Sequence, residues 1–348
     1  MGIGGADGPS VFRRMASLAE LAADPRARDL LDPVGVGALP STIRPRGDHA
    51  GVRLASINIH MATPAHDALF PQTNERLDAL RDVARWVQAV DPDVLFVQEL
   101  RNRPVAAAIA HGGVGDAAST LGRLIDADDM AFTPAIAQDP FSTPHAHYGT
   151  AIYVRNGFSI DQAINARLPT STPDVELRSV GVAGVFPPDG REPLTVVGTH
   201  LANRVVEDQP LRNVQVGAIM DIADQVAAGG RVAYVDALDG TQQLSSGAFP
   251  TRRIAWFGDL NQEQDLTDQI VNARGFTHAN DLLAAHGDAR SRTRAAMATM
   301  DTSMHGEHRI DHGYLRGTDV SDSAVGSVAS HEYPGPATDH RGLVVDLP

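Results

Sequence analysis

The spacing of apolar residues changes along the chain, and each spacing predicts an element. Two short apolar runs, VRLASIN at 52–58 and DVLFVQ at 93–98, have the composition of buried strands. Between them, apolar residues recur every three or four positions from Leu77 to Val87, after Asn74 as the N-cap. This spacing predicts an amphipathic helix. The expected order is therefore strand, helix, strand.

Later apolar runs extend this pattern. A second long helix is predicted over 211–227, LRNVQVGAIMDIADQVA. Many strands with helices between them, and no internal repeat, predict an α/β fold. The further strands are predicted at GTAIYVR (149–155), SVGVAGVF (179–186), LTVVGTH (194–200), RIAWFGD (253–259), RIDHGYL (309–315) and GLVVDL (342–347).

The first fifty residues differ from the rest in composition. They contain one candidate short helix, SLAELAADPRARDLL, and then GVGALPSTIRPRGD, a Pro/Gly-rich linker. We therefore predict an N-terminal extension over residues 1–50 and one domain over 51–348. Residues 229–251 exceed the length that a direct connection needs. They are either a hairpin beside the functional site or a surface insertion.

Composition narrows the class of protein. Apolar residues make up 43% of the chain and charged residues 21%, which is typical of a globular protein. No apolar run approaches the roughly eighteen residues that a membrane span needs, and the N-terminus lacks the order of a secretory signal. We therefore expect a cytoplasmic protein, unless a leader has been removed. Without cysteine, a bound metal must use oxygen or imidazole ligands, which favours hard cations.

Polar residues stand where the predicted apolar strands end. Each has a simple explanation as a turn former or a solvated strand end when it is taken alone. Together, on strands that should lie side by side, they indicate convergence on one pocket. The residues are Asn58, Glu99, His200, Asp259 with Asn261, Asp311, and Asp339 with His340 just before the last strand.

The residue types suggest a chemistry for this pocket. Glu99, Asp339 and the amide oxygen of Asn58 form an oxygen-only set that Mg²⁺ or Mn²⁺ accepts. The motifs of serine hydrolases, P-loop proteins and dinucleotide-binding proteins do not occur. The chemistry predicted is that of a phosphoesterase without a covalent intermediate.

The other polar residues fit hydrolysis by water. Asp259, with Asn261 beside it, could hold and deprotonate a water for attack on phosphorus. His200 and His340 could stabilise the transition state or protonate a leaving oxygen. Asp311 would fix the tautomer of one of them and raise its pKa.

Seven motifs carry a resemblance to a known family. INIH, DPDVLFVQE, YGTAIYVR, VVGTH, GDLN, RIDH and TDHRGLVV occur in the order and approximate spacing of the endonuclease/exonuclease/phosphatase superfamily. That superfamily contains DNase I-like nucleases, apurinic endonucleases, inositol-polyphosphate phosphatases and neutral sphingomyelinases. The resemblance covers about residues 51–348, and the combination of GDLN, DPDVLFVQE and TDHR in this order carries most of it.

The resemblance implies a DNase I-like α/β (α+β) fold, a four-layered sandwich of two packed, mostly antiparallel sheets flanked by helices, with a divalent cation at one edge. It also implies roles for the polar residues. These are Glu99 and Asn58 on the metal side, Asp259 and Asn261 as the water-handling pair, Asp311 and His340 as an Asp-His dyad, His200 as a second catalytic histidine, and Tyr148 as a phosphate contact.

Some residues depart from the family pattern. An aromatic residue usually follows the dyad aspartate, whereas this chain has His312, for which we expect a packing role. His60, His145 and His147 lie close to motif residues, and we expect them at the rim of the pocket. Another feature is an arginine triplet that would point one way on an extended segment, as a phosphate contact or as a solvated charge run. It consists of Arg290, Arg292 and Arg294.

These observations leave three functions open. The first is a divalent-metal-dependent phosphodiesterase of nuclease type. Against it stand the net charge of −14, which repels polyanions, and the low aromatic content. The second is hydrolysis of a small phosphorylated metabolite or a lipid headgroup, and the third is a non-catalytic binding module. The sequence indicates no protein partner and does not determine the oligomeric state.

Overall fold

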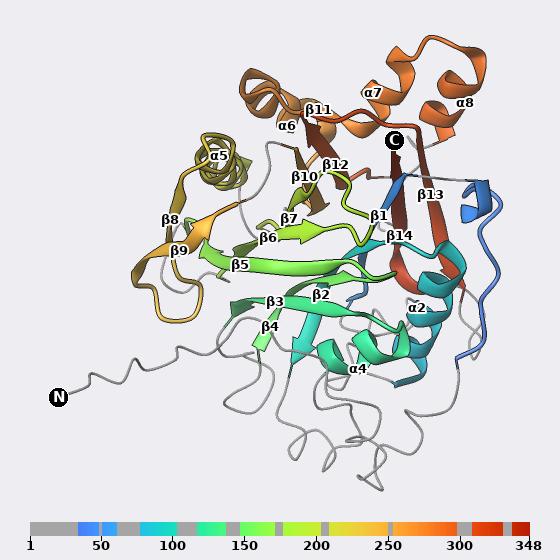
Figure 1. The fold of residues 1–348 in the computed structure, drawn as a ribbon, viewed down its shortest axis with the longest axis horizontal. Coiled ribbons are helices and arrows are strands. Elements are labelled where there is room, and N and C mark those ends of the chain that lie inside the picture. Colours follow the sequence, from blue (N-terminus) through green and yellow to red (C-terminus); the bar gives the residue numbers. More distant parts are fainter. Residues whose placement is uncertain are drawn as a thin grey trace, which may run out of the picture.

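The structure is a computed structural model in which two six-stranded β-sheets pack face to face with helices around them (Figure 1). It describes residues 34–48, 51–60, 77–102, 117–136, 147–170, 177–202, 209–249, 253–297, 308–329 and 336–348. The predicted α/β sandwich of mixed, mostly antiparallel sheets is confirmed. The candidate helix at 17–31 and the Asn74 cap lie outside the described residues.

The first sheet has the strand order β13-β14-β1-β2-β4-β3. Only β1 and β2 run parallel in it, and every other neighbouring pair is antiparallel. Its strands are β1 (Val52–Asn58), β2 (Val94–Asn102), β3 (Asp129–Ile136), β4 (His147–Val154), β13 (Asp322–Ala329) and β14 (Pro336–Leu347).

The second sheet has the order β11-β12-β10-β7-β6-β5 and is built in the same way. Its one parallel pair is β7 with β10, which lies between antiparallel neighbours. Its strands are β5 (Ser159–Arg167), β6 (Ser179–Phe186), β7 (Leu194–His200), β10 (Ile254–Asp259), β11 (Thr277–His278) and β12 (Asp311–Arg316).

The space between the two sheets is filled by apolar side chains. Phe96 of β2 stacks on Phe257 of β10, with ring centroids 5.1 Å apart. These central strands are buried on both faces, so they read in the sequence as continuous apolar runs. This packing fixes the central strands of one sheet against those of the other.

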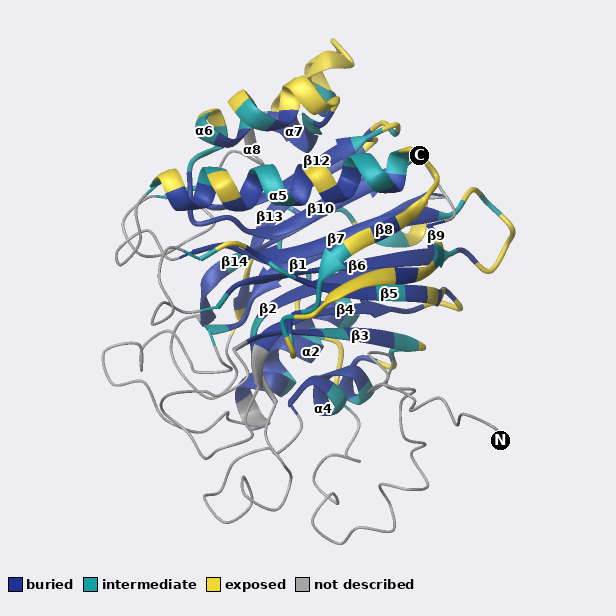
Figure 2. Cartoon of the chain, turned by 90° about the vertical axis from the view of Figure 1, so that its left-hand side faces the viewer, coloured by how far each residue is buried: buried dark blue, intermediate teal, exposed yellow. Residues whose placement is uncertain are grey.

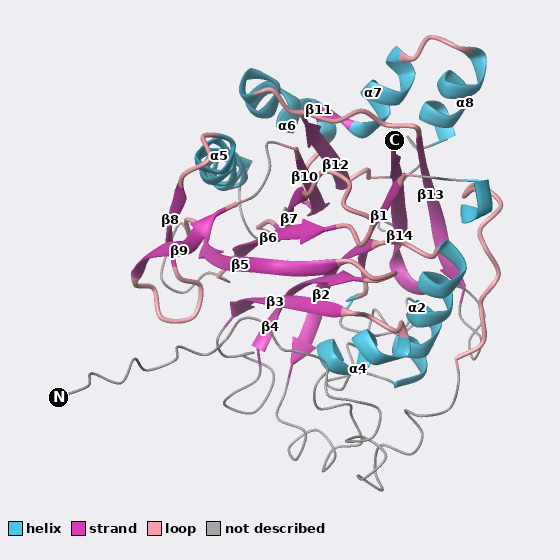
Figure 3. Ribbon diagram, viewed as in Figure 1, coloured by secondary structure: helices cyan, strands magenta, loops and turns pink. Residues whose placement is uncertain are grey.

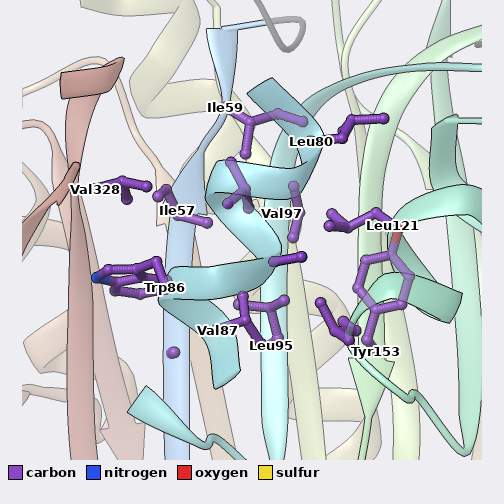
Figure 4. Packing of buried hydrophobic residues seen from close by; sticks show 14 of the residues in the cluster. Ile57, Ile59, Leu80, Trp86, Val87, Leu95, Val97, Leu121, Tyr153 and Val328 are labelled. Atoms are coloured by element: carbon purple, nitrogen blue, oxygen red, sulfur yellow. The ribbon is translucent and has the colours of Figure 1, made fainter. Parts of the chain in front are cut away.

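Helices cover the outer faces of both sheets (Figure 3). Figure 4 shows Leu80, Trp86 and Val87 of α2 packed over β1 and β2, and Figure 2 shows buried residues on one side of α5 and exposed residues on the other. Among the described residues no helix is both long and apolar enough to cross a bilayer. The helices are α2 (Leu77–Val90), α4 (Ala117–Leu124), α5 (Gln209–Ala227), α6 (Gln264–Val271), α7 (Ala279–Ala285), α8 (Ala289–Met297) and the 3-10 helices η2 (Arg46–Asp48) and η5 (Asn272–Arg274).

The described part of the predicted linker packs on the domain. The Gly37 N–H donates to the carbonyl oxygen of Arg85 in α2 at 3.1 Å, and the Thr42 hydroxyl donates to the carbonyl oxygen of Val325 in β13 at 2.6 Å. Ile43 is buried in the core. Residues 34–48 therefore contribute to the fold.

The described part of the extra length, residues 229–249, forms a hairpin, as one alternative expected, but not next to the strands that carry the site. Its strands β8 (Arg231–Val235) and β9 (Gln242–Ala248) pair with each other. The Gln162 amide of β5 donates to the Ala248 carbonyl oxygen at 2.7 Å. The hairpin therefore covers the edge strand β5, with β6 between β5 and the strand that ends at His200.

The arginine triplet lies on a helix and not on an extended segment, so the condition for three parallel phosphate contacts is not met. Residues 289–297 form α8, where residues two positions apart point about 200° apart around the axis. Arg292 therefore cannot share a face with Arg290 and Arg294. Arg290 and Arg292 are exposed, and the side chain of Arg294 lies outside the described part.

Candidate functional site

The topology brings the predicted polar residues to one edge of the sandwich. The parallel pair β1 and β2 ends near Asn58 and Glu99, and the parallel pair β7 and β10 ends at His200 and Asp259. Because β12 and β14 run antiparallel to these pairs, they contribute residues near their beginnings.

Two details of the expected strand ends therefore differ. Asp311 begins β12, where it pairs with Asp259 of β10, and Asp339 and His340 lie within β14. An antiparallel strand must present its start where a parallel strand presents its end, so the shared edge is kept.

Unusual backbone conformations aim the side chains at this edge. Glu99 has a left-handed φ of 58° beside a bulge between Val97 and Leu100, and Asn261 has a φ of 52°. Gly258 has a φ of 156°, and a Cβ there would collide with the carbonyl oxygen of Thr199. Such conformations cost about 1–3 kcal/mol each and persist only where the surrounding structure holds them.

Two carboxylates meet at the amide of Asn58. Its Nδ2 donates to Glu99 Oε1 at 2.9 Å and to Asp259 Oδ2 at 3.0 Å, and its Oδ1 accepts the His60 N–H at 2.9 Å. A backbone N–H can only donate, so this contact fixes the orientation of the amide. The amide oxygen predicted as a metal ligand therefore faces the backbone, and the amide nitrogen faces the carboxylates.

His200 is held in one tautomer by an arginine that the sequence did not reveal as a site residue. Arg178 NH1 lies 3.0 Å from His200 Nδ1 and can only donate, so the ring proton is on Nε2. Nε2 faces Asp259 Oδ2 at 3.6 Å and Glu99 Oε1 at 3.9 Å. Burial, followed by the charges of Arg178 and His340, lowers the pKa of His200 well below its ordinary value. His200 is therefore a neutral hydrogen-bond donor.

His340 has the opposite electrostatic character. Its Nδ1 lies 2.8 Å from Asp311 Oδ2, and its Nε2 lies 3.7 Å from Asp259 Oδ2 and 4.0 Å from Asp339 Oδ1. Burial alone would lower the pKa of His340, but the charges of Asp311, Asp259 and Asp339 outweigh burial and raise it well above the ordinary value. The predicted pairing of Asp311 with His340 is thus present, and the ring is cationic.

Asp259 lies between these groups. Burial, followed by the charge of Asp311, raises the pKa of Asp259 to about 7, although His340 and the Asn58 hydrogen bond act in the other direction. Its Oδ1 accepts the Asn261 N–H at 2.9 Å, and Asn261 Nδ2 donates to the Leu201 carbonyl oxygen at 3.1 Å. Asp259 and Asn261 are thus fixed relative to each other.

The donor atoms fit a divalent cation held by oxygen. Among the described residues, two groups have ligand atoms within 4.8 Å of one another, Glu99 with His200 and Asp259, and Asp259 with Asp311 and His340. The Nε2 atom of His200 carries its proton, and both ring nitrogens of the cationic His340 do. The carboxylates of Glu99 and Asp259 are therefore the donors that suit Mg²⁺ or Mn²⁺. Neither group contains Asp339.

The remaining predicted residues are placed less fully. Tyr148 lies in β4 opposite Arg101 of β2, but its side chain, like that of His147, lies outside the described part. His145 lies outside it altogether. Thr338 is a further residue that the sequence did not single out, and its hydroxyl donates to the Asn58 carbonyl oxygen at 2.8 Å. It ties β14 to β1 beside the site.

The fold and the edge site together define a DNase I-like sandwich of the phosphoesterase class. Residues 55–340 match the sequence pattern of the Endonuclease/Exonuclease/phosphatase family, and the chain belongs to that family. A search of curated proteins finds no significant match.

Solved structures agree on the fold at low sequence identity. The truncated TDP2 of Caenorhabditis elegans is 18% identical over 86% of this chain and 97% of its own, with a TM-score of 0.57. The catalytic domain of human Nocturnin with bound sulfate anion is 16% identical over 90% and 99%, with a TM-score of 0.59. The TDP2 of D. rerio complexed with single strand DNA product is 14% identical over 86% and 99%, with a TM-score of 0.53.

Proposed function

We propose that this protein is a divalent-metal-dependent phosphodiesterase of nuclease type that attacks phosphorus with an activated water. One observation carries the proposal. Asp259 faces a neutral donor, His200, and a cationic donor, His340, and Glu99 faces His200, all within one cluster. Such a cluster can bind a cation, accept a proton from water and stabilise negative charge on phosphoryl oxygens.

The proton transfer is assigned to Asp259. A base is most effective when its pKa lies near the working pH, and the pKa of Asp259 is about 7. Its Oδ1 accepts the Asn261 N–H and its Oδ2 accepts the Asn58 amide, and Oδ2 also faces both histidines, so Oδ2 is assigned to take the proton from the attacking water. Asn261, anchored to Leu201, orients that water.

The histidines are assigned to charge stabilisation. His200 donates from Nε2 to a phosphoryl oxygen and stays neutral, because Arg178 occupies its other nitrogen. His340 carries a positive charge that Asp311 maintains, so it stabilises the transition state and protonates the leaving oxygen.

A Mg²⁺ or Mn²⁺ ion held by Glu99, beside Asp259, would supply further neutralisation of charge on the phosphoryl group. Asp339 supports this site through its charge near His340. Asn58 holds the two carboxylates together by donating to both. Tyr148 is proposed as a phosphate contact, as the family resemblance implies.

The substrate class proposed is a nucleic acid. The D. rerio TDP2 structure of the same fold is complexed with single strand DNA product, which supports this choice. The net charge of −14 favours the alternative, a small phosphorylated metabolite or a lipid headgroup, because that substrate needs no extended cationic surface. The α8 arginines support neither case, because Arg292 cannot share a face with Arg290 and Arg294. A binding module without turnover is the third alternative.

A substrate panel tests the proposal. Oligonucleotides, small phosphoesters and phospholipids are incubated with the protein and Mg²⁺ or Mn²⁺, with EDTA as the control. We expect hydrolysis of at least one phosphodiester that EDTA abolishes, and rates on oligonucleotides that fall steeply with added salt. Hydrolysis with weak salt dependence would favour the small-substrate alternative. Binding without hydrolysis under every condition would contradict the proposal.

A further inference from the structure

A chain of buried imidazoles lies on the face of the second sheet that α6 covers, outside the cluster of catalytic side chains. His312 of β12 and His278 of β11 are both buried, with His278 Nε2 3.2 Å from His312 Nδ1. The far nitrogen of His312, Nε2, lies 2.9 Å from the carbonyl oxygen of Gln262. Gln262 directly follows the turn that contains Asp259 and Asn261, so the chain ends at the backbone of the proposed water-handling pair.

Both ends of this chain fix the same direction of hydrogen bonding. The Gln262 carbonyl can only accept, so His312 Nε2 carries a proton and, in the neutral ring, Nδ1 accepts. At the other end, the Asn280 N–H lies 3.2 Å from His278 Nδ1 and can only donate, so the proton of His278 is on Nε2. With the Asn280 N–H as the partner of His278 Nδ1, each ring donates from Nε2.

The surroundings keep both rings neutral. Arg309 NH2 lies 3.2 Å from Nε2 and 3.4 Å from Nδ1 of His278, so a fixed positive charge stands beside this ring. Burial, followed by the charge of Arg309, lowers the pKa of His312 to about 3, and burial with the charge of His312 lowers that of His278 well below its ordinary value. A second proton on either ring would break the chain.

The turn needs this restraint because Asn261, a non-glycine residue, has a left-handed φ of 52°. The turn is tied by Leu260 N–H to the Ile310 carbonyl at 2.8 Å and by Asn261 Nδ2 to Leu201. Gln262 Nε2 donates to the Thr267 hydroxyl of α6 at 2.6 Å. His312 of β12 adds a hydrogen bond from the sheet to the Gln262 carbonyl oxygen at the end of this turn.

We propose that His278 and His312 are positioning residues that hold the turn from Gly258 to Gln262, and with it Asp259 and Asn261, through a directed hydrogen-bond chain to the Gln262 carbonyl. The position that the family fills with an aromatic side chain thus serves the site in this protein. The catalytic part of the inference rests on the proposed function, whereas the structural part does not.

Hydrogen exchange tests the structural part without any substrate. The Asn261 N–H donates to Asp259 Oδ1, so its exchange rate reports the order of the turn. In the full chain, His312→Phe removes the donor to Gln262, and His312→Gln keeps a donor that can reach it. We expect exchange at Asn261 to accelerate about tenfold or more in the phenylalanine variant and to return towards wild type in the glutamine variant.

Kinetics test the catalytic part. On a substrate identified by the panel, His312→Phe should lower kcat by about tenfold or more with KM nearly unchanged, because the pair is displaced while the binding surface is intact. His312→Gln should recover most of kcat. His278→Phe, which removes the donor to His312, should show a smaller loss of the same kind. His286→Phe, at the end of α7, is the control and should leave both constants unchanged.

The outcomes separate the two claims. Unchanged Asn261 exchange in His312→Phe, or equal exchange in the phenylalanine and glutamine variants, would overturn the positioning role. Accelerated exchange with unchanged kcat would overturn its catalytic part. If His312→Phe does not fold, the comparison of His312→Gln with His278→Phe gives the same decision. A wild-type protein inactive on every phosphoester would refute the proposed function, and the exchange data would still decide the structural role.

Discussion

Acid should weaken this fold through a buried histidine that cannot take up a proton. The pKa of His312 is about 3 in the folded chain, because burial and then the charge of Arg309 disfavour the cation. Its value in the unfolded chain is the ordinary one of about 6.5. Between these two values the unfolded chain binds a proton that the folded chain does not, so stability falls as the pH falls.

The size of the effect follows from the two pKa values. Between pH 7 and pH 5, the unfolded His312 goes from mostly neutral to almost fully protonated, which costs the folded state about 2 kcal/mol. His278 adds a loss of the same sign. The raised pKa values of Asp259 and His340 act in the opposite direction, so the total for the wild type is not the quantity to test.

A comparison of variants isolates the contribution of His312. The free energy of unfolding is measured by urea titration at pH 7 and pH 5 for the wild type and His312→Phe. The wild type should lose about 2 kcal/mol more than the variant over this interval, since all other titrating groups are shared. His286→Phe removes a histidine that is one-third exposed, and it should follow the wild type. An equal acid loss in the wild type and His312→Phe would refute the reasoning.

Two further predictions concern the parts of the fold that hold the site. Gly258→Ala should destabilise the protein by about 3 kcal/mol or more in urea unfolding, because its Cβ meets a backbone carbonyl at a positive φ. Gly230→Ala, where a Cβ meets open space, is the control and should be close to neutral. Asp346→Asn should cost about 3–5 kcal/mol, because it leaves the buried Arg53 guanidinium without the carboxylate that it contacts at 2.7 and 2.9 Å. A loss below 1 kcal/mol at either position would contradict these estimates.

The sequence was sufficient for the central strands and insufficient for the edges. All eight strands predicted from apolar runs are present, because strands buried on both faces need apolar residues at nearly every position. The strands that were not predicted are the four sheet edges, β3, β5, β11 and β13, and the hairpin strands β8 and β9. β11 has two residues, β5 alternates between buried and exposed positions, and β9, QQLSSGA, is mostly exposed. β3, DMAFTPAI, and β13, DSAVGSVA, are mostly buried, but their apolar residues are interrupted by Thr133 and Pro134 and by Gly326 and Ser327.

The sequence predicted which polar residues lie close together in the site. It did not predict their hydrogen-bond partners. The meeting of these residues could be predicted from their positions at strand ends. Neighbouring strands place such residues at the same edge of the sheet, regardless of how the loops run. The tautomer of His200 depends on Arg178, and the orientation of the Asn58 amide depends on the backbone N–H of His60. The Arg178–His200 contact joins the residue before β6 to the end of β7, and the His60–Asn58 contact depends on the positive φ of His60. The spacing of residues along the sequence predicts neither contact.

The arginine triplet shows a different limit. Arginines at every second position are compatible with an exposed strand and with an exposed helix. Neither structure requires that the residues between the arginines be buried. The segment that carries Arg290 and Arg292 became the helix α8, which packs on the sheet through the buried Ala295. Tertiary packing that no charge pattern reveals accompanies the helical conformation.

The central claim is that one cluster at the sheet edge performs hydrolysis, and its direct test is the activity of Asp259→Asn and His340→Ala with Mg²⁺ present. Both variants should lose hydrolysis by about two to four orders of magnitude, and Asp259→Asn should melt within a few degrees of the wild type. Asp221→Asn, an exposed acid on α5, is the matched control and should retain activity. Full activity of both Asp259→Asn and His340→Ala on the same substrate would contradict the account.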